Sequence, residues 1–129
     1  MTSQPTGDGG RTIGLKLTAI ETEMLGSDAD ALMAALGRAL WAAADLRMGK
    51  SRAEWWPVLT DVSQLMRQLG GVQDAALRQM PDASHAEIAT SLGLSRTTVA
   101  SRRQKGTLPP AEPTEWEGWV RTGTYPHEN

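Results

Sequence analysis

The residues best suited to binding chemistry lie between Arg96 and Lys105, where four basic residues occur without an acidic one. Serine, threonine and glutamine side chains are interleaved with these cations. Cations and hydroxyls bind phosphate oxygens, and arginine, glutamine and threonine can also hydrogen-bond the edges of bases in the major groove. The stretch therefore predicts a surface that binds double-stranded DNA.

If this stretch is a helix, its positions divide between bases and phosphates. Base edges are expected to be read by Arg96, Thr97, Ala100, Ser101 and Gln104. Phosphates are expected to be contacted by Ser95, Thr98, Arg102, Arg103 and Lys105. Arg96 is the best candidate for a guanine contact because a guanidinium can donate twice to one base. His85 would open a preceding helix, where backbone amides also favour phosphate.

The spacing within residues 84–104 predicts two short helices joined by a tight turn, a helix-turn-helix. Ala89 supplies a small residue where the helices cross, and Gly93 can adopt the left-handed conformation that closes the turn. Val99 lies on the inner face of the second helix, and Ser95 is expected to be its N-cap. These elements would present the second helix outward.

The stretch from Ser84 to Arg102 resembles the helix-turn-helix of bacterial transcription proteins, especially the region-four domain of sigma factors. The likeness extends upstream to a helix at residues 72–80 and covers about Val72 to Lys105, which implies a tri-helical DNA-binding module. Outside that span nothing resembles a sigma factor, and there is no promoter-melting domain, so we expect a regulator instead. Arg102 and Arg103 stand where the family usually has an apolar residue, which predicts a loosely anchored helix end.

Composition excludes several kinds of chemistry. The chain has no cysteine, which excludes disulfides, thiolate metal sites and cysteine nucleophiles, and its only histidines are His85 and His127. We therefore expect no metal, no cofactor and no catalytic residue. No run of eighteen apolar residues and no secretory leader is visible, so we expect a soluble, cytoplasmic protein that is nucleoid-associated when bound to DNA.

The N-terminal residues predict little regular structure. Residues 1–11 are rich in glycine and polar residues and are interpreted as a disordered leader; a phosphate-binding loop is a weaker alternative because no lysine follows the glycines. From Thr12 the alternation of Ile13, Leu15 and Leu17 suits a short strand, which could pair with its copy in a dimer. Residues 19–25 could instead begin a helix that ends at Gly26.

A long helix is expected from Asp28 to about Met48, with Ser27 as N-cap and acids near its positive end. Apolar residues or alanine cover most of its circumference, with a stripe at Leu32, Leu36, Ala39, Leu40, Ala43 and Leu46. Two explanations are open: a central helix packed by its own neighbours, or a helix covered by a second subunit.

A second helical pattern runs to Leu69 and is expected to end at Gly70 and Gly71. Ser51 and Glu54 have the spacing of a capping box, but Pro57 then predicts either a kink near Trp55 and Trp56 or a later start. The two tryptophans are expected in core or dimer packing more often than in a ligand pocket. The following helix, at residues 72–80, is expected to have a buried side formed by Ala75, Ala76, Leu77 and Met80 and to end at Pro81 and Asp82.

After Gly106 stops the second motif helix, Pro109, Pro110 and Pro113 predict an extended connector. Trp116, Trp119 and Val120 then share one helical face, which could dock on this chain, on its dimer mate or on an external protein partner. Residues 122–129 are expected to be frayed, and there is no pattern for a wing.

These patterns predict an all-α chain with a helical oligomerisation region at residues 12–71, a helix-turn-helix module at 72–106 and a tail at 107–129. The expected function is that of a homodimeric, sequence-specific DNA-binding transcription regulator, most simply a repressor. The alternative is an antitoxin-like or phage-like interaction factor that grips a protein target through its tryptophans, with DNA binding secondary or lost.

Overall fold

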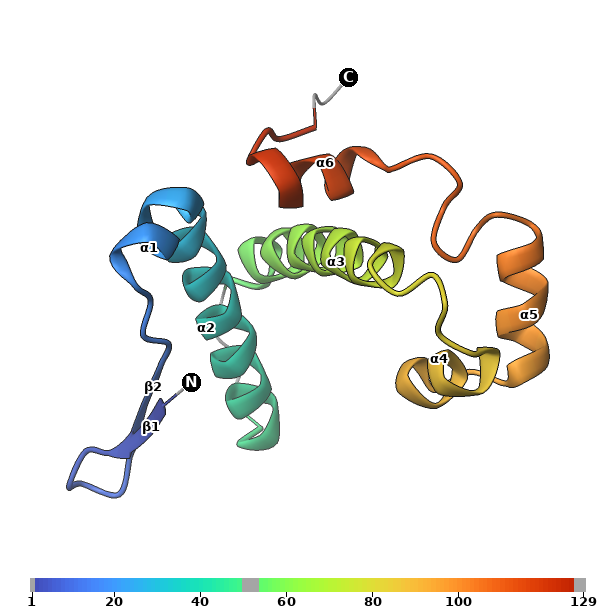
Figure 1. The fold of residues 1–129 in the computed structure, drawn as a ribbon. Helices are drawn as coiled ribbons and strands as arrows, with labels where there is room; N and C mark the ends of the chain where they lie inside the picture. The colour runs from blue at the N-terminus through green and yellow to red at the C-terminus, as the bar shows by residue number, and fades with distance from the viewer. Residues whose placement is uncertain (1, 50–53, 127–129) are drawn as a thin grey trace. The chain divides into compact units, whose positions relative to one another are not determined.

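The computed structural model describes residues 2–49 and 54–126 (Figure 1). Within these ranges the chain has six helices and one two-stranded sheet, so the prediction of a mostly helical fold is confirmed. The chain divides into two compact units, residues 1–33 and residues 34–129.

The first unit begins with a hairpin where the sequence predicted a disordered leader. Strand β1 (Thr2–Pro5) pairs antiparallel with β2 (Arg11–Gly14), with Pro5 opposite Arg11. In the connection Gly7 and Gly9 have positive φ, and Asp8 Oδ1 accepts a hydrogen bond from the Gly10 amide at 3.0 Å. Glycine tolerates such conformations at little cost, so the residues interpreted as disordered are suited to a turn instead. The strand predicted from Thr12 is confirmed, but it pairs within its own chain.

Two helices follow the hairpin. Helix α1 (Ala19–Leu25) has a capping box between Thr18 and Glu21 and ends at Gly26, which confirms the helix considered for these residues. Helix α2 (Asp28–Arg47) matches its predicted bounds within one residue and continues into the second unit. Its predicted apolar stripe is poorly covered, since Leu40 is 59% exposed, and Asp45 is the one α2 residue classed as buried within the described chain.

Helix α3 (Trp55–Arg78) is the longest element and corrects the prediction that Gly70 and Gly71 end a helix. It starts at Trp55, which confirms the later start and leaves Pro57 in the first turn, where its missing N–H removes no helical hydrogen bond. Ser51, the first residue of the predicted capping box, lies outside the described residues. The helix expected at residues 72–80 is not a separate helix, because residues 72–78 form the end of α3.

Helix α6 (Glu115–Thr122) packs along α3 and explains the glycine at position 71 in the interior of that helix (Figure 1). A Cβ at Gly71 would lie 2.5 Å from the backbone oxygen of Trp116, so only glycine allows this approach. Trp119 is buried, and its ring centroid lies 6.0 Å from that of Tyr125. Docking of the tail on its own chain is therefore confirmed, whereas fraying from Thr122 onward was wrong at Tyr125.

A buried carboxylate ties α6 to α3. Glu117 is fully buried, and its two oxygens accept hydrogen bonds from Arg78 Nε at 2.7 Å and Arg78 Nη2 at 2.9 Å. Arg121 Nη2 donates to the same carboxylate at 3.2 Å, and Arg78 Nη2 also donates to the Pro110 carbonyl at 2.7 Å. The hydrogen bonds from Arg78, followed by those from Arg121, lower the pKa of Glu117. One ionic network therefore joins α3, α6 and the proline connector.

The end of α3 also contributes to a small apolar core with the next two helices, α4 (His85–Leu92) and α5 (Arg96–Gln104). Leu77 of α3 packs there with Ile88, Ala89 and Val99, and Val99 is fully buried. The predicted inward-facing positions of Ala89 and Val99 are confirmed. Helix α3 thus joins α6 on one side to α4 and α5 at its C-terminal end.

Gly71→Ala should destabilise the fold by about 1 to 3 kcal/mol, because the new methyl group overlaps the α6 backbone. Gly70→Ala is the matched control, since a Cβ at Gly70 would meet no described atom within 4 Å. The control should instead stabilise α3 by about 0.5 to 1 kcal/mol through helix propensity. Urea unfolding followed by tryptophan fluorescence measures both, and equal effects of the two variants would contradict the close approach.

Glu117→Gln should lower stability at neutral pH and reduce its dependence on acid. Because the folded-state pKa of Glu117 lies below the ordinary 4.5, its stabilisation is present above that value and is lost as pH falls through the folded pKa. Asp74 affects the pH dependence of stability in the opposite direction, because burial and the charge of Glu117 raise its pKa. The stability gap between parent and variant should therefore narrow in acid, and urea titrations from neutral pH to about pH 3 test this.

Candidate functional site

The connection between α4 and α5 is fixed by three consecutive residues, Gly93 to Ser95. Gly93 has φ 69° and ψ 30°, the left-handed conformation predicted for it, and the Leu94 amide donates to the Ala89 carbonyl at 3.0 Å. Ser95 caps α5 as predicted, since its Oγ accepts from the Thr98 amide at 3.1 Å. The orientation of α5 relative to α4 is therefore set by backbone conformation, capping and the buried Val99.

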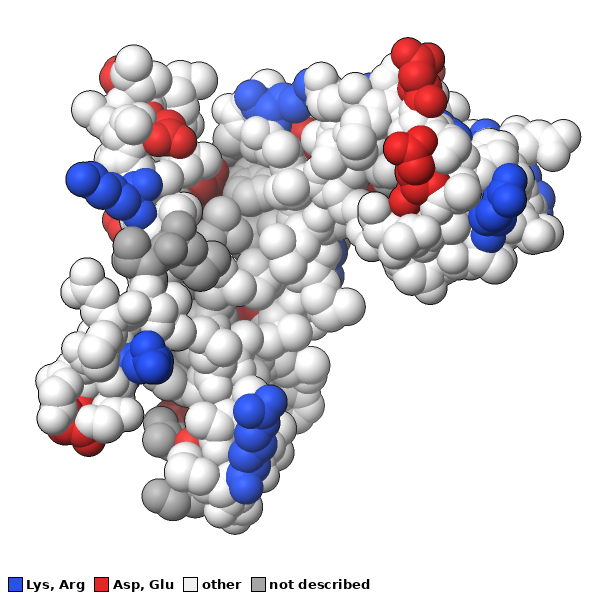
Figure 2. All heavy atoms as spheres, turned by 60° about the horizontal axis from the view of Figure 1, so that its bottom comes forward, with Lys and Arg blue, Asp and Glu red and all other residues white. Residues whose placement is uncertain are grey.

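The solvent-facing side of α5 carries most of the predicted contact residues. Arg96, Thr97, Arg102, Gln104 and the following Lys105 are exposed, whereas Ala100 and Ser101 are partly buried. In Figure 2 cationic side chains lie at the right-hand edge, over the α5 end of the second unit, with acidic side chains beside them and not among them. The structure therefore brings several predicted base-reading and phosphate-binding residues onto one exposed face.

Arg103 lies differently from the other cations. Its Nη1 donates to the Ala83 carbonyl at 2.8 Å and lies 3.0 Å from His85 Nδ1, while Nη2 donates to the Pro81 carbonyl at 3.2 Å. The prediction that this end of α5 is loosely anchored was wrong, because polar contacts replace the apolar contact that the sequence lacks. Arg103 connects α5 to the turn before α4.

The contact with Arg103 also orients His85. A guanidinium has five donors and no acceptor, so His85 Nδ1 must accept, and the ring proton of a neutral His85 then lies on Nε2. Three of the Arg103 donors are engaged within the chain, which leaves fewer for a phosphate than at Arg102, for which the structure gives no side-chain hydrogen bond. His85 and Arg103 therefore act together at the start of α4.

The two predicted hydroxyl contacts at the start of α5 are engaged with each other. Ser95 Oγ donates to Thr98 Oγ1 at 2.8 Å while it accepts from the Thr98 amide. The Thr98 hydroxyl proton remains available to an incoming phosphate oxygen, and so do the exposed amides of the first turn. Ser95 is thus primarily a capping residue, and Thr98 is the more available donor.

Two positioning features of the site were not predicted from the sequence. Ser84 and Glu87 form a capping box at the start of α4, which lowers the pKa of Glu87 and could have been found from the Ser-x-x-Glu spacing. The contact of Arg78 with Glu117 joins residues 39 positions apart, so no local sequence pattern predicts it. The first feature holds the start of α4, and the second holds α6 and the connector that follows α5 against α3.

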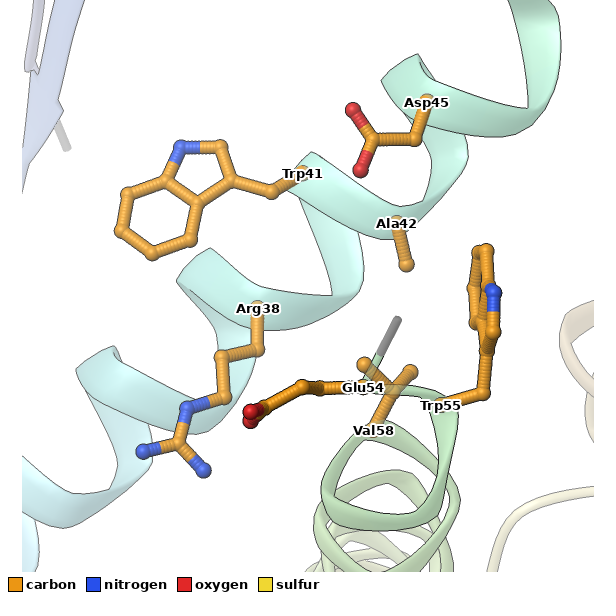
Figure 3. Close-up of a pocket in the computed structure, with 7 residues that line it drawn as sticks. All are labelled: Arg38, Trp41, Ala42, Asp45, Glu54, Trp55 and Val58. Atoms are coloured by element: carbon orange, nitrogen blue, oxygen red, sulfur yellow. The ribbon is translucent and has the colours of Figure 1, made fainter. Parts of the chain in front are cut away.

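A small cavity elsewhere in the second unit is one alternative site (Figure 3). Trp41 and Asp45 of α2 line it with Glu54, Trp55 and Val58 at the start of α3. Its volume of about 130 Å³ is below the roughly 300 to 1,000 Å³ of typical ligand sites. Trp55 thus borders a cavity, but one too small to carry a ligand proposal.

Within residues 2–49 and 54–126 there is no group of three or more side chains that could hold a metal ion. Over the same described ranges, every helix is too short or too polar to cross a membrane.

Arg103→Ala should destabilise the fold by about 1 to 3 kcal/mol, because it leaves the Pro81 and Ala83 carbonyls without their partner. Arg102→Ala removes the same charge from an exposed position and should change stability by less than about 0.5 kcal/mol. Thermal unfolding of both variants compares the two roles. If Arg102→Ala is the more destabilising change, the assignment of Arg103 as the anchor is wrong.

Comparison of the chain with protein-family models, with curated proteins and with solved structures finds no match in any of the three. The exposed face of α5 and the contacts that hold it are therefore the features of the chain that bear on its function.

Proposed function

We propose that this chain is a sequence-specific DNA-binding regulator in which α4 and α5 form a helix-turn-helix. In this arrangement α5 is the recognition helix and enters the major groove, and the N-terminus of α4 lies near the phosphate backbone. Occupying a promoter and thereby excluding transcription proteins is the simplest mode of action. The proposal assigns no catalytic step, no cofactor and no metal to the chain.

One observation carries the proposal: the exposed face of α5 is cationic and hydroxylated, while its opposite face is closed by the fully buried Val99. An exposed helix that bound another protein would more commonly present apolar or aromatic side chains at its centre. Guanidinium, amide and hydroxyl groups are the side chains that DNA contacts require. The formal net charge of the whole chain is −2, so the cations of α5 matter by their location and not by their sum.

The geometry refines which residues we assign to each role. Arg96, Thr97 and Gln104 are the strongest candidates for base edges, because all three are exposed, and Arg96 can donate twice to guanine. Arg102 and Lys105 are the strongest candidates for phosphates. Ala100 and Ser101 keep their proposed base-facing positions with less exposed surface.

A second set of residues mainly positions the helices and contacts phosphate only secondarily: His85, Ser95, Thr98 and Arg103. Each takes part in a hydrogen bond that holds α4 or α5, so we assign them first to positioning and second to phosphate contact. A protein that presents its recognition helix by such contacts loses less conformational entropy when DNA binds.

We further propose that the regulator acts as a homodimer on a near-palindromic site. One recognition helix reads only a few base pairs, and helix-turn-helix proteins commonly pair two of them across a twofold axis. The half-sites would then be centred about 34 Å apart, or a multiple of that distance. The exposed apolar side chains of α2 and α3 are consistent with a missing subunit.

The alternative function is a protein-interaction factor that grips its target through Trp116 and Trp119. Its support is weaker because Trp119 is buried against its own chain and Trp116 packs in the same aromatic cluster. The two functions differ in salt dependence, since DNA binding that neutralises phosphates weakens steeply as salt rises.

Selection of bound sequences from a random DNA pool tests the proposed function directly. A DNA-binding regulator enriches one motif, and a dimer enriches a motif with twofold symmetry. Binding of that motif should be salt-dependent and should exceed the binding of scrambled DNA by about 10³-fold or more. A pool that returns no enriched motif at low salt would overturn the proposal.

Arg96→Ala should cost about 1 to 3 kcal/mol on the selected site and relax the preference at one base pair. Lys105→Ala should weaken all sequences alike and reduce the slope of log affinity against log salt. Arg67→Ala, an exposed change on α3, is the control and should leave both quantities unchanged. Anisotropy titrations at several salt concentrations separate the three variants, and full affinity in Arg96→Ala would show that α5 is not oriented as proposed.

A further inference from the structure

Helix α3 carries an apolar stripe on a side that α6 does not cover. Leu59, Val62, Met66 and Leu69 follow one another at intervals of three, four and three residues, which places them on one face of the helix. Leu59 is 56%, Met66 68% and Leu69 52% exposed. The contact with α6 lies around Gly71 and the buried Gln68, on another face of α3. We call these four residues the α3 stripe.

The spacing of the α3 stripe suits contact with another helix. Intervals of three and four average 3.5 residues, which keeps a seam facing a partner helix along its length. The positions that flank the seam are Ser63, Gly70, Leu65 and Val72. The charged residues of α3 are Asp61, Arg67, Asp74 and Arg78, and none of them lies in the stripe. An identical surface can therefore meet the stripe without opposing like charges, as twofold pairing requires.

The stripe widens toward the start of α3. Trp55, Trp56, Val58, Leu59 and Val62 line one shallow apolar depression, and Trp56 is 81% exposed. Together with Val72, the stripe and Trp56 offer on the order of 500 to 700 Å² of apolar surface. That exceeds most of the range of roughly 300 to 600 Å² for the largest patch of a typical monomer and approaches the ~800 Å² that each partner buries in a standard interface.

We propose that a second copy of this chain packs on the α3 stripe, with α3 against α3 across a twofold axis. The inference rests on the proposed function for its purpose, since it names the surface through which the DNA-binding dimer forms. A self-complementary seam favours a second copy over an unrelated protein. The α3 stripe also lies on the helix that contributes Leu77 and Arg78 to the contacts of the C-terminal helices. A dimer formed through the stripe would therefore be joined directly to the part of the chain that carries α5.

Sedimentation velocity without DNA tests the seam by itself. The parent should be a dimer at micromolar concentration, and Met66→Glu should weaken self-association about tenfold or more, because it places a charge in an apolar interface. Leu69→Glu should act in the same direction. Arg67→Glu adds a carboxylate at the neighbouring exposed position outside the stripe and should leave the dimer intact. Circular dichroism should show unchanged helix content in the separated chains, since Met66 is largely exposed within one chain.

Two outcomes would overturn this inference. A parent that is monomeric, with a melting temperature independent of concentration and lowered by Met66→Glu, would mean that another part of the same chain covers the stripe. A monomeric parent that is unaffected by Met66→Glu would mean that the stripe does not mediate self-association. Because no DNA is present, failure here is separable from failure of the proposed function: a dimer split by Met66→Glu that binds no DNA motif contradicts only the latter.

Discussion

The buried carboxylate of Glu117 is the interaction on which the second unit most depends. An ionised carboxylate loses its hydration when it is buried, and this cost is offset only when other groups satisfy its oxygens. Arg78 does so with two hydrogen bonds, and Arg121 adds a third. The geometry of this fork–fork pair accepts little displacement, so it fixes the position of α6 along α3 more sharply than apolar contact alone would. The same guanidinium holds Pro110, which places the connector that follows α5.

Polar anchoring recurs at α5. A short helix with one fully buried apolar residue, Val99, has little hydrophobic contact to hold it. Arg103 compensates by donating to two carbonyls of the turn before α4, beside His85. An apolar residue at this position would hold the helix by burial instead. The cations at the end of α5 therefore have two different positions. Arg103 is directed inward, whereas Arg102 and Lys105 are exposed on the surface.

Local patterns predicted most of the helices and much of the candidate site. Ser95 and Gly93 act within a few residues of their own positions, so capping and backbone preference were enough to identify the turn between α4 and α5. Two predictions failed for a different reason. Gly70 and Gly71 were predicted to end a helix. In the structure α6 crosses so close to Gly71 that this position cannot carry a side chain. The contact is with Trp116, 45 residues further along the chain, so the sequence around the glycines does not indicate it. The end of α5 was predicted to be loosely anchored because sequence alone does not show that the Arg103 side chain turns back to the Ala83 and Pro81 carbonyls.

Because α3 is continuous, the part of the chain that carries the α3 stripe is rigidly linked to the C-terminal contacts of that helix. With a break at the glycines, the helices before and after it could rotate independently, and a dimer formed by one would not orient the other. A single helix of 24 residues, roughly 36 Å long, instead joins the exposed apolar stripe to the contacts made by Leu77 and Arg78. Any partner that packs on the stripe would therefore also constrain α5 through the core that Leu77 and Val99 share. The spacing between two copies of α5 in such an assembly would then depend on α3 and its C-terminal contacts.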